Sequence, residues 1–323
     1  MANQDKRSIQ FVTILLAILT VIFLLAVNTV GFIDTETGSG FACGNSWPLC
    51  EGVLIPQHMG IHKLIEFGHR ALVPIATLLL LATSVFALIQ YRKLREVVWL
   101  IVLAIASVFV QGALGALGVI FGDPAWFLAF HFGISLIAFA SVLLLCILLF
   151  QLRRVPLQEI LQGGRLRPDY SATGSRIRSL VWWSLIYIYV EMYFGAYISS
   201  SGAAPFFHGW PFPTESIYAP HYAFWMDCIH RLFALGLLVF SLFILRSAAS
   251  LRNLRSDLYR AAWGTVILVL LQALSGILIV TYHNVSSFLI HVTLVAFLFS
   301  SLCLLALLTV PDRPRKKSAS TTL

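Results

Sequence analysis

The chain has 323 residues, of which 59% are hydrophobic and only 11% are charged, and its mean hydropathy is +0.87. These values lie far outside the range of soluble domains and predict an integral membrane protein. The formal net charge is +8. Because the basic residues gather at one set of helix ends, this charge is explained by membrane topology, and we expect no nucleic-acid partner.

Eight apolar segments reach or approach the roughly 20 residues that an α-helix needs to cross a bilayer core of about 30 Å. In chain order they cover residues 9–29, 65–91, 97–121, 126–150, 180–199, 224–245, 261–282 and 288–310. We therefore predict an all-α fold with eight transmembrane helices. The first segment is too long for the apolar region of a signal peptide and lacks a convincing cleavage site, so we expect it to be retained.

The distribution of charge predicts the topology. Lys and Arg residues concentrate at the N-terminus, in the loops after the second, fourth and sixth helices, and in the tail at residues 313–317. The positive-inside rule assigns those segments, and with them both termini, to the cytoplasmic side of the cell membrane. The long loops 31–60 and 200–223 contain no Lys or Arg. They are expected to face outward.

The two halves of the chain repeat a set of polar residues at one constant spacing. Glu66, His69, Arg70 and Gln111 align with Asp227, His230, Arg231 and Gln272. His131 pairs with His291 at a spacing one residue shorter, which a short outer turn would absorb. Because each half holds four helices and begins inside, we predict two four-helix bundles related by a pseudo-twofold axis along the membrane normal. Residues 1–150 form the first bundle, 151–178 a cytoplasmic linker and 179–323 the second bundle.

Four histidines lie within about two turns of the outer ends of the even-numbered helices: His69, His131, His230 and His291. Each bundle thus places two imidazoles at one depth on facing helices, an arrangement that clamps a metal or a haem. Helix packing alone would leave these polar rings at a high free-energy cost. Two histidines leave zinc short of ligands but complete the coordination of a haem iron. We predict two haem sites, although the nearby carboxylates keep zinc as an alternative.

Charged residues flank the histidines in both halves. Glu66 and Asp227 precede a histidine by three residues and share its helical face, so each is a candidate metal ligand, hydrogen-bond acceptor or general acid/base. Arg70 and Arg231 would either contact haem propionates or snorkel outward and neutralise the carboxylate. Glu191 lies inside the fifth predicted helix without a counterpart in the first half, and its role stays open.

Cys43 and Cys50 lie in the first outer loop, separated by the turn-forming stretch GNSWPL. An outward-facing loop is exposed to an oxidising compartment, so we expect a disulfide between them. Such a bond would either order the loop or act as a redox-active pair.

Several motifs occur together in one order along the chain. They are TGSGFACGNSWPLCEG in the first outer loop, EFGHR at 66–70, QGALGALGVIFG at 111–122 and HFGISLIAFASVLLL at 131–145. Their combination resembles the haem A synthase family of the Firmicutes type over nearly the whole chain. The resemblance implies an oxidoreductase that converts the C8 methyl group of haem O to a formyl group, giving haem A for haem-copper terminal oxidases.

The resemblance also implies a role for each site residue. His69 and His131 match the family's substrate-haem histidines, Glu66 matches its catalytic acid, and His230 and His291 match the axial ligands of a resident haem b cofactor. The implied partners are haem O, membrane lipid, a haem O synthase that supplies the substrate, and an electron donor such as quinol. Unlike some relatives, the loop 200–223 has no second cysteine pair.

Two other functions use some of the same features. A di-haem b protein that oxidises quinol without modifying haem would also need two bis-histidine bundles. The unequal pair Glu66 and Asp227, together with the elaborate first outer loop, favours the synthase. A thiol-oxidising protein built on Cys43 and Cys50 would leave the four histidines unexplained.

Overall fold

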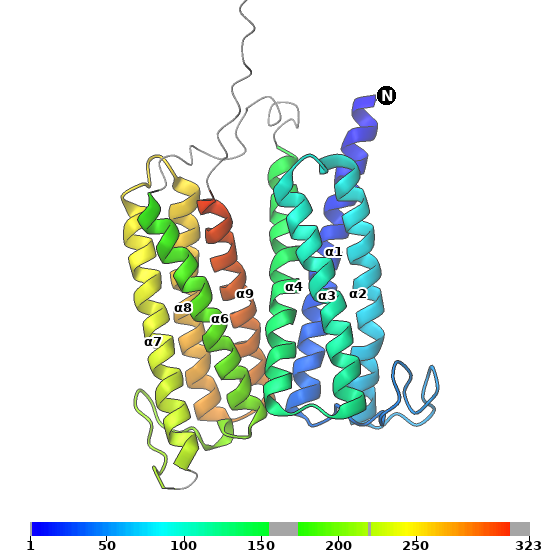
Figure 1. Ribbon diagram of the computed structural model, residues 1–323, viewed down its shortest axis with the longest axis vertical. Coiled ribbons are helices and arrows are strands. Elements are labelled where there is room, and N and C mark those ends of the chain that lie inside the picture. The colour runs from blue at the N-terminus through cyan, green and yellow to red at the C-terminus, as the bar shows by residue number, and fades with distance from the viewer. Residues whose placement is uncertain (1, 155–173, 219–220, 311–323) are drawn as a thin grey trace, which may run out of the picture.

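Eight long helices run alongside one another in the structure (Figure 1). The computed structural model describes residues 2–154, 174–218 and 221–310. The helices are α1 (Ala2–Glu36), α2 (Ile61–Tyr91), α3 (Arg95–Phe121), α4 (Ala125–Leu152), α6 (Ser175–Ser200), α7 (His221–Ala249), α8 (Ser256–Tyr282) and α9 (Val285–Thr309). One short 3-10 helix, η2 (Ala204–Phe206), lies in the second outer loop. The predicted all-α fold is confirmed.

Seven of the described helices are long and apolar enough to cross a membrane, namely α1, α2, α3, α4, α7, α8 and α9. The chain is therefore a multi-pass membrane protein. Helix α6 is less apolar because it carries four tyrosines and Glu191. Its 26 residues still give a length of about 39 Å at 1.5 Å per residue, enough for a bilayer core. It lies against α4, α7 and α9, which supports an eighth crossing.

The helices of each half lie together, with α1–α4 on one side of Figure 1 and α6–α9 on the other. The two groups meet where α4 contacts α6 and α9, and where α1 contacts α9. Residues 155–173, most of the predicted linker, lie outside the described residues. The ends of that linker belong to α4 and α6. The pseudo-twofold relation between the groups stays a prediction.

Aromatic and small residues pack the two groups together. Phe139 of α4 meets Phe297 of α9 edge to face, with ring centroids 5.5 Å apart. On the same helix, Gly133 leaves room for Tyr193 of α6: a Cβ atom at Gly133 would lie 2.5 Å from the Tyr193 hydroxyl oxygen. Small residues of this kind let helices approach closely inside a bilayer, where lipid removes most of the hydrophobic drive for association.

Replacing Gly133 tests this contact. We expect Gly133→Ala to destabilise the protein by about 1–3 kcal/mol, because the added methyl group overpacks the helix interface. Gly112→Ala is the matched control, since nothing lies within 4 Å of a Cβ atom at that helical glycine. Thermal unfolding in detergent measures both variants. Equal melting temperatures for the two would contradict the proposed packing.

Candidate haem site

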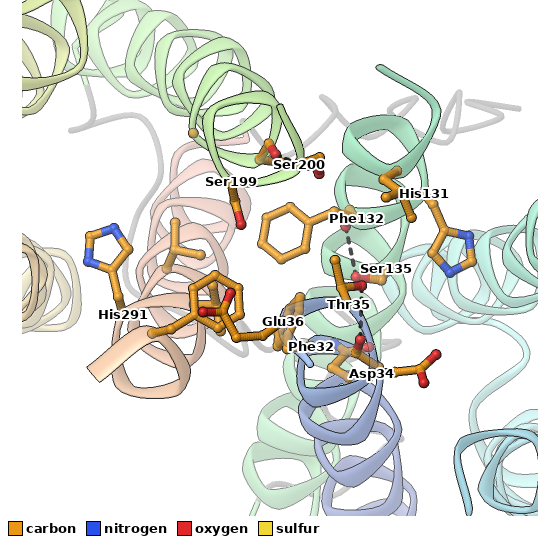
Figure 2. A pocket seen from close by; sticks show the side chains of 18 of the residues that line it. Phe32, Asp34, Thr35, Glu36, His131, Phe132, Ser135, Ser199, Ser200 and His291 are labelled. Atoms are coloured by element: carbon orange, nitrogen blue, oxygen red, sulfur yellow. Dashed lines mark hydrogen bonds between the residues drawn. The ribbon is translucent and has the colours of Figure 1, made fainter. Parts of the chain in front are cut away.

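A cavity of about 2070 Å³ connects the two halves, and all four predicted histidines line it. Figure 2 shows His131 and His291 on opposite sides, with Phe32 and Phe132 between them. The ring centroids of these two phenylalanines are 4.9 Å apart. The structure thus brings the predicted residues together as two histidine pairs in one cavity, separated by aromatic side chains.

In the second half, the rings of His230 and His291 face each other from α7 and α9, with centroids 6.4 Å apart. Two metal–imidazole bonds of about 2 Å each, together with half of each ring, need a separation of this size. The Nδ1 atom of His230 is buried without a hydrogen-bond partner. This donor set fits an iron bound between two imidazoles.

Residues of α8 orient the His291 ring. Gln272 Nε2 lies 3.1 Å from His291 Nε2, and Ser275 Oγ lies 2.9 Å from His291 Nδ1. The Gln272 amide therefore sits beside the nitrogen that a metal would use, while Ser275 accepts from the opposite side of the ring. The repeated pattern in the sequence identified Gln272 but did not show that it lies beside His291.

In the first half, His69 lies on α2 and His131 on α4. His69 Nδ1 lies 3.1 Å from the carbonyl oxygen of Val27, which leaves Nε2 free to bind a metal. His131 Nδ1 is buried without a partner. The first half therefore also presents two buried imidazoles, each with a ring nitrogen available to bind an iron.

Each histidine ring packs against a glycine of the preceding helix. A Cβ atom would lie 2.9 Å from His69 Cε1 at Gly31 and 3.4 Å from His230 Cε1 at Gly195. It would lie 3.7 Å from His131 Cε1 at Gly115 and 3.8 Å from His291 Cε1 at Gly276. Gly31 and Gly195 could not be identified from the sequence, because neither belongs to the repeated polar pattern.

The buried carboxylates beside the histidines each form an ion pair with an arginine one helical turn further along the same helix. Glu66 is only 2% exposed, and Arg70 Nη2 donates to its Oε1 atom. Arg231 donates through Nε to Asp227 Oδ1 at 2.7 Å and through Nη2 to Asp227 Oδ2. The arginines therefore neutralise the carboxylates; the contact with haem propionates stays a prediction.

The same arginines hold the loop between α1 and α2 and the loop between α6 and α7. Arg70 Nη1 donates to the carbonyl oxygens of Ser46 and Leu49, both at 2.6 Å. Arg231 donates to the carbonyl oxygens of Pro211 at 3.1 Å and His208 at 3.3 Å. Each half thus fixes its outer loop above the cavity through one arginine.

The predicted disulfide between Cys43 and Cys50 is present. It closes the part of the loop that Arg70 holds, and the Cys43 backbone N–H donates to Glu66 Oε2 at 2.6 Å. Glu66 therefore has one oxygen bound to Arg70 and the other to the disulfide loop. Sequence spacing could not predict this hydrogen bond, since 23 residues separate the two partners.

Two further carboxylates line the cavity near the first pair of histidines. Asp34 lies at the outer end of α1, and its Oδ1 atom is buried without a partner. Asp123 lies between α3 and α4, and partial burial raises the pKa of its carboxyl group. Neither Asp34 nor Asp123 was predicted from the sequence as a site residue.

The side chains present suit haem better than zinc. Within residues 2–154, 174–218 and 221–310, His, Cys, Asp and Glu do not gather in groups of three or more that would hold a metal ion. A zinc site usually needs three or four such ligands, whereas a haem iron already has four porphyrin nitrogens.

The family model described as cytochrome oxidase assembly protein (COX15-CtaA) matches residues 14–303. The chain belongs to this family. "Heme A synthase" of Bacillus pumilus is 33% identical over 305 residues, covering 93% of this chain and 95% of the relative. The Bacillus licheniformis protein of that name is 33% identical over 92% of this chain and 96% of its own length. The Staphylococcus epidermidis protein is 30% identical over 91% and 94%. The predicted resemblance is confirmed.

Replacing Arg70 with lysine tests the loop contacts. Lysine keeps the positive charge but cannot reach Glu66 and two loop carbonyls in the fixed geometry of a guanidinium. We expect Arg70→Lys to raise amide hydrogen exchange in residues 43–50 roughly tenfold, since each lost hydrogen bond is worth about 1 kcal/mol. Exchange in the 208–211 loop, which Arg231 holds, is the internal control. Unchanged exchange in residues 43–50 would contradict this role.

Proposed function

We propose that the chain is a haem A synthase that oxidises the C8 methyl group of haem O to a formyl group, with substrate haem in the first half and haem b in the second. Membership of the family and the names of its relatives support the activity. The observation that carries the two-site assignment is a single cavity lined by two histidine pairs, only one of which lies below a disulfide loop bound to a buried carboxylate.

The histidines divide between substrate and cofactor. His69 and His131 hold the iron of haem O and of the product haem A, whereas His230 and His291 hold haem b. Haem b, when bound, supplies one-electron redox chemistry to the first half. The glycine behind each ring supports these roles, because it lets the imidazole approach the neighbouring helix closely.

Glu66 is the proposed catalytic residue. Conversion of a methyl to a formyl group replaces two C–H bonds with a C=O bond. It therefore needs an oxidant, for which we propose dioxygen with the quinol as co-reductant, and an acid/base group near the substrate. Glu66 is a buried carboxylate three residues before His69, and its position is fixed by Arg70 and by the Cys43 N–H. Asp227 has the shorter side chain and no disulfide loop above it, which suits a half that only carries electrons.

The topology and the partners complete the proposal. Both termini lie in the cytoplasm, residues 1–150 and 179–323 form pseudo-twofold-related bundles, and 151–178 links them in the cytoplasm. A haem O synthase supplies the substrate and a quinol supplies electrons, both from within the membrane. The basic N-terminus, linker and tail support this orientation.

Replacing Glu66 with glutamine tests the catalytic role. We expect Glu66→Gln to lower haem A formation at least roughly 100-fold, because general acid–base catalysis typically contributes 10²–10⁴. Haem b content should stay unchanged. Asp227→Asn is the matched control and should keep most of the activity. Haems extracted from cells that also express a haem O synthase are separated by chromatography. Full haem A formation by Glu66→Gln would overturn the assignment.

A further inference from the structure

A haem bound between the histidines would turn its propionate edge toward the outer mouth of each half. The histidines lie near the outer helix ends, and a haem carries two ionised propionates along one edge. Placing those charges in the apolar interior would cost several kcal/mol, so the edge turns toward the polar end of the cavity. Residues at the two outer mouths therefore decide how strongly the propionates are held.

The histidine–glycine contacts show which mouth residues correspond between the halves. Gly31 and Gly195 hold equivalent positions against His69 and His230. Three residues beyond these glycines lie Asp34 in the first half and Ile198 in the second. A carboxylate at the first mouth is thus matched by an apolar side chain at the second.

The outer ends of α3 and α8 correspond in the same way. Gly115 and Gly276 hold equivalent positions against His131 and His291. Eight residues beyond them lie Asp123 in the first half and Asn284 in the second, and both line the cavity. At this position too, a carboxylate is matched by a neutral residue.

The first mouth carries negative charge that no nearby cation balances fully. Asp34 lies within electrostatic range of Glu66, Asp123 and Arg70. Arg70 is already ion-paired with Glu66, which leaves the two aspartates in excess when they are ionised. They therefore repel the propionates of a haem in this half.

The second mouth also has a carboxylate beyond its ion pair, since Glu215 lies within electrostatic range of Asp227. The residue that lines the cavity at this mouth, however, is an imidazole. His283 lines the cavity and follows α8 in the left-handed conformation, with φ of 43°. The corresponding residue of the first half is Gly122, with φ of 89°. A side chain at this position costs free energy that glycine avoids. The His283 ring lies 5.1 Å from that of His208, and an imidazole N–H can donate to a propionate.

Glu36 adds a carboxylate on the side of the second half, which reduces this contrast without removing it. It also lies at the end of α1, but Figure 2 shows it pointing away from Asp34 and toward the side of His291. Its side chain is exposed, so water and salt screen its charge.

We infer that these mouths set how long each half keeps its haem: Asp34 and Asp123 weaken the hold of the first half on haem so that product leaves, while His283 and Asn284 help the second half to retain its haem. This inference rests on the proposed function, because it takes one half as the substrate site and the other as the cofactor site.

Haem transfer to apomyoglobin tests the inference. Protein purified from cells that also express a haem O synthase should release haem in a fast phase from the first half and a slow phase from the second. We expect Asp34→Asn with Asp123→Asn to slow the fast phase roughly three- to tenfold, as expected for removing two nearby like charges in a partly aqueous site. The slow phase should stay unchanged. Glu36→Gln, the matched control, should alter neither phase, and His283→Gly should accelerate the slow phase.

The outcomes separate this inference from the proposed function. A His131→Ala variant should lose the fast phase altogether. Suppose that His131→Ala loses the fast phase but the Asp34→Asn, Asp123→Asn variant releases haem as fast as the unaltered protein or faster. The role of the mouth charges is then overturned and the site assignment stands. If His131→Ala keeps the fast phase, both are overturned.

Discussion

Imidazole rings inside a membrane need partners, and the rest of this protein is arranged around that requirement. A polar group in the hydrocarbon layer costs free energy unless it is hydrogen-bonded or ligated. His69 and His291 have hydrogen bonds from neighbouring helices, whereas His131 and His230 each keep a buried nitrogen without one. A haem iron between each pair would bind one nitrogen of each ring and hold all four rings in place.

The two halves share this arrangement but differ in what surrounds it. In both, an arginine joins a buried carboxylate to the carbonyl groups of an outer loop. Only in the first half does a disulfide loop donate a backbone N–H to that carboxylate. The disulfide can therefore position Glu66 through this loop without being oxidised or reduced. Between the halves, Phe32 contacts Phe132 and Phe288, so the two histidine pairs are separated by packed aromatic rings.

Much of the fold could be predicted from the sequence, because long apolar segments in a bilayer leave little choice but helices. The segment predicted at 97–121 lies within α3, Arg95–Phe121. The first helix was predicted to end at residue 29 but extends to Glu36. A hydropathy pattern ends where the residues become polar. The helix itself continues, because its backbone hydrogen bonds extend into the membrane interface.

The histidine pairs could be predicted because a constant spacing identifies them in both halves. The glycines behind the rings could not all be found this way. The spacing between Gly31 and Gly195 is three residues longer than the spacing between His69 and His230. An alignment at the histidine spacing therefore pairs Glu191 with Val30, whereas the glycine contacts pair it with Val27. The hydrogen bond from the Cys43 N–H to Glu66 could not be predicted either, because any residue type in a loop can supply a backbone donor.

The central claim is that the two histidine pairs hold two different haems, and the identity of the haem lost from each half tests it most directly. His131→Ala and His291→Ala variants, each purified after expression with a haem O synthase, would be extracted and their haems quantified by chromatography. The account predicts that His131→Ala keeps haem b and loses haem O and haem A, while His291→Ala loses haem b. Loss of the same haem in both variants would contradict it.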